Sequence, residues 1–199
     1  MKKILIVFWM TLIPLAVLAD GYQPGDKARG FRLKNVDGQV VSLDDYPSAK
    51  GFVVIFTCNT CPYAVAYEDR IIDLDMKYRP LGMPVIAVNP NDPSISPGDS
   101  FDKMVQRADE KDFTFPYLFD ETQEVFKAYG ATHTPHVYLL KKEGSELIVK
   151  YVGTIDDNYK DASSVQKTYL ADAIDAVLSG ANPDPSLTKA IGCSVKYKK

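Results

Sequence analysis

The chain has 199 residues, of which 46% are hydrophobic, so it can form one domain with a sizeable core but not two full-sized domains. It carries 23 basic and 26 acidic residues, a formal net charge of −3, and shows no basic stripe. Because binding to phosphates needs clustered lysine and arginine, a nucleic-acid partner is not expected.

Residues 1–19 have the pattern of a secretory signal peptide. Two lysines precede an apolar run, Ile4–Leu18, and a small-residue cleavage pattern ends at Ala19. The run is short for a membrane-spanning helix, so cleavage is preferred over an uncleaved anchor. We therefore expect a periplasmic or secreted protein that begins at Asp20 and meets a membrane only through this segment, if it stays uncleaved.

Tight-turn signals predict two β-hairpins. Phe31–Val36 and Gln39–Leu43 flank Asp37-Gly38, a dipeptide that accepts positive backbone angles. Later in the chain, His136–Leu140 and Leu147–Val152 flank a Lys-Lys-Glu-Gly turn. The segment before the first hairpin, Tyr22–Ala28, is a polar entry that contains Pro24-Gly25.

Between the hairpins, an apolar run of strand length, Phe52–Phe56, leads into Cys58-Asn59-Thr60-Cys61, and helical spacing follows to Leu81-Gly82. We expect both cysteines at the first turn of this helix, where unpaired backbone N–H groups stabilise a thiolate. Cys58 is then the reactive thiol and needs to be reachable from solvent. The acidic run Glu68–Asp75 is predicted to form a solvated helix face.

The remaining elements alternate between strands and helices. A buried strand is expected at Met83–Val88, parallel to the first, followed by a loop at Asn89–Pro97 and a short strand at Phe115–Phe119. Capping and glycine signals predict three further helices. These run from Asp99 or Ser100 to about Lys111, from Asp120 to Gly130, and from Ser163 or Ser164 to Gly180.

This order predicts an α/β fold in which one central sheet carries helices on both faces. Residues 20–180 form the expected domain, and residues 181–199 form a C-terminal tail that carries Cys193.

The chain resembles the thioredoxin fold, and more closely the exported peroxiredoxin-like proteins grouped as alkyl hydroperoxide reductase and thiol-specific antioxidant (redoxin) proteins. The resemblance covers about Gln23–Lys196 and is carried by CNTCPYAVAYEDR, DETQEVFKAYGATHTP and GCSVK. It implies three layers, a central mixed β-sheet, an N-terminal hairpin and an insertion after the second core strand. It also implies that Thr134-Pro135 is a cis peptide facing the dithiol, with a backbone edge that binds the substrate. The alternative is an ordinary trans proline at a strand start.

Two positions depart from the family patterns. Thioredoxins carry a buried acid six residues before the first cysteine, where this chain has Phe52. Proton removal from Cys61 is therefore left to Glu68, Asp69, His133 or water. Peroxiredoxins carry a threonine three residues before the peroxide-attacking cysteine, which aligns with Cys61, and this chain has a cysteine there. Direct peroxidase activity is therefore in doubt.

The leading hypothesis is an enzyme, a thiol-disulfide oxidoreductase without cofactor or metal, whose partners are a protein disulfide or small-thiol substrate and a redox partner for recycling. Cys58 attacks and Cys61 resolves. Four alternatives stay open: a thiol-dependent peroxidase, a Sco-like Cu(I) site that adds His133 or His136 to the cysteines, a structural disulfide, and a non-catalytic binding module.

Cys193 is an odd third cysteine in a chain expected in an oxidising compartment. It is a candidate third redox thiol that pairs with Cys58 or with another subunit. The alternative is a buried tail cysteine that packs as a small apolar group.

Overall fold

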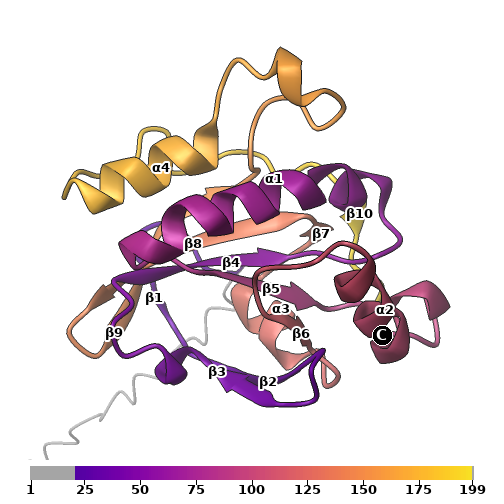
Figure 1. The fold of residues 1–199 in the computed structure, drawn as a ribbon. Coiled ribbons are helices and arrows are strands. Elements are labelled where there is room, and N and C mark those ends of the chain that lie inside the picture. Colours follow the sequence, from indigo (N-terminus) through magenta and orange to yellow (C-terminus); the bar gives the residue numbers. More distant parts are fainter. Residues whose placement is uncertain (1–20, 199) are drawn as a thin grey trace, which may run out of the picture.

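The computed structural model describes residues 21–198, and Figure 1 shows their arrangement. Eight strands form one mixed sheet, parallel from β4 through β5 to β6 and antiparallel elsewhere. In spatial order they are β1 (Lys27–Ala28), β9 (Glu146–Gly153), β8 (His136–Glu143), β4 (Gly51–Phe56), β5 (Val85–Asn89), β6 (Tyr117–Phe119), β2 (Arg32–Asn35) and β3 (Val40–Ser42). The predicted hairpins are the pairs β2–β3 and β8–β9.

Strand β4 lies at the centre of the sheet and is buried on both faces. Val53 and Ile55 join the core cluster beneath α1 (Pro62–Tyr78), α2 (Phe101–Glu110) and α4 (Tyr169–Leu178). The alternate side chains of β4 join the cluster that contains α3 (Glu124–Tyr129). In Figure 1, α1 and α4 lie on one side of the sheet and α3 on the other. Two buried faces explain why β4 is an unbroken apolar run, and the predicted sheet with helices on both faces is confirmed.

Two acidic residues of α1 are buried, which corrects the prediction of a fully solvated acidic face. The Asp75 carboxylate accepts hydrogen bonds from the Val85 amide (3.1 Å) and the Thr114 hydroxyl (2.8 Å). Glu68 accepts two from Arg107 of α2, at 2.8 and 2.6 Å. A carboxylate can leave water when donors on a neighbouring element replace its hydration, and the spacing along α1 does not reveal such donors.

Two predicted helices begin later than their capping signals suggest, whereas α2 begins directly after Ser100, one of its two predicted caps. Asp120 accepts from the amides of Val125 (3.3 Å) and Phe126 (2.8 Å), yet α3 starts only at Glu124. The serines before α4 form a separate 3₁₀ turn, Ala162–Ser164. Asp99 does not cap α2, and its carboxylate faces the cysteine loop instead.

The tail packs along the domain. Leu187 bridges to Val152, and β10 (Cys193–Ser194) pairs antiparallel with β7 (His133–Thr134) in a second, two-stranded sheet. Within residues 21–198, no helix combines the length and apolarity needed to cross a bilayer. The predicted signal peptide, residues 1–19, lies outside the described residues.

Candidate redox site

The two cysteines occupy different positions relative to α1. The helix begins at Pro62, so Cys61 is its N-cap residue and Cys58 lies three residues earlier in the loop after β4. The expectation that both lie at the first helical turn is therefore correct for Cys61 and wrong for Cys58.

Both sulfurs contact Thr134. Cys58 Sγ lies 3.2 Å from Thr134 Oγ1, and Cys61 Sγ lies 3.0 Å from the Thr134 carbonyl oxygen. Each of these cysteine side chains is the largest influence on the pKa of the other. The peptide between Thr134 and Pro135 is cis, as the resemblance implies, so the trans alternative is wrong. Residues 76 positions apart in the sequence thus form one site.

The dithiol is enclosed. Cys58 is 3% exposed and Cys61 is 2% exposed, so the prediction that Cys58 is reachable from solvent is wrong for this conformation. The insertion between β5 and α2 forms part of this cover. The side-chain amide of Asn59, in the cysteine loop, donates to the carbonyl oxygen of Gly98 in the insertion (2.9 Å). A Cβ at Gly98 would lie 2.6 Å from Thr60 Cγ2, so a larger residue there would require the Thr60 side chain to move.

Asp99, which sequence reasoning assigned to a helix cap, holds the cysteine loop. Its fully buried carboxylate accepts from the backbone amides of Asn59 (2.8 Å) and Thr60 (3.1 Å) and from the Thr60 hydroxyl (2.8 Å). It also accepts from the side chains of Ser96 (2.6 Å) and Asn91 (2.8 Å). An acidic residue in a Pro/Asn/Ser-rich loop was the available signal, but its partner, 39 residues away, was not visible in the sequence.

The pKa values of the two cysteines shift in opposite directions. The hydrogen bond from Cys58, with amide hydrogen bonds from Ala64 and Cys193, outweighs burial and lowers the pKa of Cys61 to about 4. The same bond to Cys61 raises the pKa of Cys58, helped by burial and by the charge of Asp99. The two shifts favour Cys61 over Cys58 as the ionised sulfur, whereas the motif predicts that Cys58 is the reactive thiol, and that assignment stays a prediction.

Of the three residues considered for proton transfer, Glu68 lies beside the dithiol. It lines a small enclosed cavity of about 10 Å³ together with Cys58 and Tyr117, a space of about one water molecule. Asp69 is exposed and pairs with Lys111 at 2.9 Å. Glu68 of α1 is thus a carboxylate near Cys58, whereas Phe52, at the strand position where thioredoxins carry an acid, is fully buried. It is on the side of Cys58, not Cys61.

Comparison with known proteins identifies the family. The model of the AhpC/TSA family matches residues 24–152. This chain belongs to the AhpC/TSA family. A putative peroxiredoxin of Mycobacterium tuberculosis is 28% identical over 141 residues, covering 69% of this chain and 80% of its own length. The thiol-disulfide oxidoreductase ResA of Halalkalibacterium halodurans is 28% identical over 162 residues, covering 73% and 86%.

Solved structures agree with the family assignment. A conserved, uncharacterised protein from Geobacillus kaustophilus has a TM-score of 0.81 and 38% identity, covering 88% of this chain and 93% of its own. A putative thiol:disulfide interchange protein DsbE from Chlorobium tepidum, at 24% identity and TM-score 0.53 over 64% and 84%, shares the fold. The predicted thioredoxin-like fold of the redoxin group is confirmed, and this AhpC/TSA chain is an oxidoreductase.

The histidines of the AhpC/TSA chain make local contacts near Pro135. His133 Nδ1 lies 2.8 Å from Thr132 Oγ1, and His136 Nδ1 accepts from the Thr132 amide at 3.3 Å. Burial, with the charge of His133, lowers the pKa of His136 to about 4, so its ring is neutral at pH 7. Within residues 21–198, no group of three or more His, Cys, Asp or Glu side chains is arranged to hold a metal ion.

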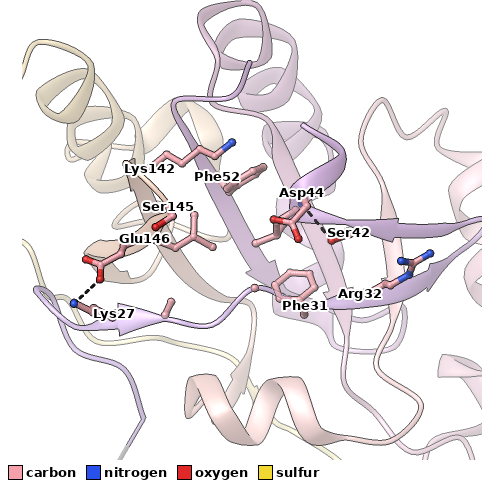
Figure 2. Close-up of a pocket in the computed structure, with 13 residues that line it drawn as sticks. Lys27, Phe31, Arg32, Ser42, Asp44, Phe52, Lys142, Ser145 and Glu146 are labelled. Carbon is pink, nitrogen blue, oxygen red and sulfur yellow. Dashed lines mark hydrogen bonds and ion pairs between the residues drawn. The ribbon is translucent and has the colours of Figure 1, made fainter. Parts of the chain in front are cut away.

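A separate cavity of about 650 Å³ opens at the other end of β4 (Figure 2). Phe52 lines it, about 13 Å along the strand from Phe56, where the cysteine loop begins. Its charged side chains have both signs, and Lys27 pairs with Glu146 (Figure 2). No cysteine lines it, so the redox chemistry of the AhpC/TSA chain belongs to the Thr134 site.

Proposed function

We propose that the chain is an exported thiol-disulfide oxidoreductase that exchanges disulfides with a protein or small-thiol partner through Cys58 and Cys61. The observation that carries this proposal is the contact of both sulfurs with Thr134, on a short strand next to Pro135. A disulfide presented in extended backbone along that edge would lie beside the dithiol. The oxidoreductase ResA among the relatives supports the same reaction class.

The ionisation of the pair suggests an order of steps. The Cys61 thiolate attacks one sulfur of the partner disulfide, a mixed disulfide forms, and the other partner sulfur leaves as a thiolate. Cys61 then carries no charge, so the bond that raised the pKa of Cys58 is gone. Cys58 gives its proton to the released thiolate and attacks Cys61. The Cys58–Cys61 disulfide forms and the partner leaves with both sulfurs reduced.

Trapping variants test this order. In Cys58→Ser with Cys193→Ser, Cys61 is the remaining cysteine, and we expect a stable mixed disulfide with a disulfide-containing peptide. The matched variant, Cys61→Ser with Cys193→Ser, keeps only Cys58 and is expected to trap far less. Intact-mass measurement distinguishes them. Equal trapping by both would reject Cys61 as the attacking sulfur, and unchanged disulfide turnover in single Cys58→Ser and Cys61→Ser variants would reject the function.

Export is part of the proposal and depends on residues 1–19. We expect the chain recovered from outside the cytoplasm to begin at Asp20, as read by intact mass. Recovery only from the cytoplasm, with residue 1 retained, would contradict it. The recycling partner is a second thiol-disulfide protein or a small thiol of that compartment.

A thiol-dependent peroxidase is the second candidate. The lowered pKa of Cys61, the position aligned with the peroxide-attacking cysteine, favours it, because a thiolate is the form that attacks peroxide. Consumption of hydrogen peroxide that saturates with peroxide and is lost in Cys61→Ser would support a peroxidase. Disulfide turnover without peroxide consumption would leave exchange as the function.

A further inference from the structure

The backbone edge beside the dithiol is occupied by the chain's own tail. Strand β10 pairs with β7, with Cys193 opposite Thr134 and Ser194 opposite His133. The Val195 amide extends the pairing by donating to the Thr132 carbonyl at 3.1 Å. This is the edge on which the proposed function requires a substrate segment to lie.

The tail is fitted to this position. A Cβ on Gly192 would lie 2.1 Å from the Thr134 carbonyl oxygen, so only glycine allows the approach. Beyond β10, the Lys196 amide donates to Asn91 Oδ1 (2.8 Å), and the Lys196 carbonyl accepts from the Asp92 amide (2.8 Å). The contact is therefore built into the packing on both sides of Cys193.

The pairing brings a third sulfur to the dithiol. The Cys193 amide donates to Cys61 Sγ at 3.3 Å, and burial together with the neighbouring Cys61 side chain raises the pKa of Cys193. Cys58, Cys61 and Ala64 form a buried cluster against which Cys193 packs. Cys193 itself is partly exposed, whereas the other two sulfurs are enclosed. Cys61 thus lies between an interior thiol and a thiol that solvent can reach.

We propose that Cys193 is a third redox-active residue whose partner is Cys61, so that one disulfide passes between the Cys58–Cys61 and Cys61–Cys193 pairs. This inference rests on the proposed disulfide exchange. In it, Cys193 is the thiol that reacts with the partner, because Cys58 and Cys61 are buried. It differs from the expectation that Cys193 pairs with Cys58 or with another subunit, and the experiment below distinguishes these pairings.

The step balances without an added oxidant. In the oxidised protein, Cys193 loses its proton and attacks Cys61. The Cys61–Cys193 bond forms, the Cys58–Cys61 bond breaks, and Cys58 leaves as a thiolate that takes up the proton. A partner thiolate then attacks the partly exposed Cys193 sulfur and releases Cys61 as a thiolate. A second partner thiol resolves the mixed disulfide, so two partner thiols become one disulfide and the protein gains two electrons.

The Cys58→Ser variant of the mature chain tests the pairing, because Cys61 and Cys193 are then its two remaining cysteines. After oxidation with glutathione disulfide, we expect complete loss of two free thiols and a peptide linking Cys61 to Cys193 in the mass map. The matched control moves the third cysteine by one residue, as Cys58→Ser with Cys193→Ser and Ser194→Cys. Successive strand side chains point to opposite faces, so this control is expected to form no such link.

Three results would overturn the inference: glutathione adducts on both cysteines of Cys58→Ser without a link, a link only between two chains, or an equal link in the control. Circular dichroism shows whether a variant has misfolded. In that case the wild-type protein is used instead: after stepwise oxidation with glutathione disulfide, it must yield the Cys61–Cys193 peptide in addition to the Cys58–Cys61 peptide. The proposed function fails separately, if wild-type protein exchanges no disulfide with glutathione at either pair.

Discussion

At the scale of single residues, the difference in pKa between Cys58 and Cys61 follows from which sulfur receives backbone N–H groups. Cys61 receives amides from Ala64 in α1 and from Cys193 in the tail, whereas Cys58 lies before the helix and near the Asp99 carboxylate. A helix start stabilises the sulfur that is on it, not one three residues earlier. The dithiol is therefore asymmetric in the sense opposite to the one expected from motif order alone.

This asymmetry predicts a pH dependence of stability. The pKa of Cys61, about 4 in the folded protein, lies below the value of about 8.5 for cysteine in an unfolded chain. A depressed pKa stabilises the fold fully above the unfolded value, and the gain is lost as pH falls through this window to about 4. The unfolding free energy of the reduced protein minus that of Cys61→Ser is therefore expected to rise from about pH 4 to pH 8, measured by urea unfolding. A flat difference would contradict the assignment of the thiolate.

Asp99 predicts a second residue-scale effect. In Asp99→Asn, Oδ1 can still accept from the amides of Asn59 and Thr60, but the new NH₂ group replaces Oδ2 and faces the Asn91 side-chain NH₂, leaving a buried donor unpaired at a cost of about 1–3 kcal/mol. We expect the unfolding free energy to fall by that order and disulfide turnover to fall with it. Asp102→Asn, an exposed change on α2, is the matched control. Equal stabilities of the two variants would show that Asp99 does not hold the loop.

Asp99 also shows where sequence reasoning stops at this scale. Cys58, Cys61 and the Thr134-Pro135 pair were identifiable because each lies in a contiguous motif with a known spacing. Asp99 lies next to no motif, and its five hydrogen bonds come from residues that the fold brings together. Burial of the cysteines was missed for the same reason, since their cover comes from an insertion and a tail.

At the scale of elements, strands were predicted better than helix faces. Strand β4 and both hairpins have local signals, a continuous apolar run and glycine turns at Gly38 and Gly144 with φ of 83° and 63°. The α1 surface has no such local signal for burial, because Glu68 is buried only when Arg107 of α2 covers it. A single element's periodicity cannot show which polar residue a neighbouring element will pair with.

The Glu68–Arg107 pair is therefore expected to join α1 to α2. Removing one partner of a buried ion pair costs about 3–5 kcal/mol of stability. Because 25% of the Arg107 side chain is exposed to solvent, we expect Glu68→Gln to lower the unfolding free energy by less, about 2 kcal/mol. Asp69→Asn, one residue along, removes an exposed carboxylate and is expected to change stability little. Urea unfolding measures both. An equal effect of the two changes would mean that burial of Glu68 contributes nothing.

At the scale of the whole molecule, both ends of the described chain pair with strands far from them in the sequence. Strand β1 pairs with β9, and β10 pairs with β7 beside the cysteines. The order of elements predicted the sheet, but no local pattern indicated that the tail would return to the active edge across 132 residues from Cys61. The tail then has two effects: it supplies an amide to the Cys61 sulfur, and it occupies the edge on which a partner would bind.

Lifting the tail should therefore expose the dithiol. In a Cys193→Ser background, Gly192→Ala introduces a Cβ 2.1 Å from the Thr134 carbonyl oxygen, and because that contact is with backbone the tail must move. We expect Cys58 and Cys61 to react several-fold faster with an aromatic disulfide reagent such as Ellman's reagent, as a covering segment limits thiol access. Ser194→Ala in the same background is the control, since Ser194 is exposed and its replacement removes no backbone contact. If both variants react at the rate of the background, the enclosure of the dithiol does not depend on the tail, and a partner must reach the cysteines from the side of the Ser96–Asp99 insertion.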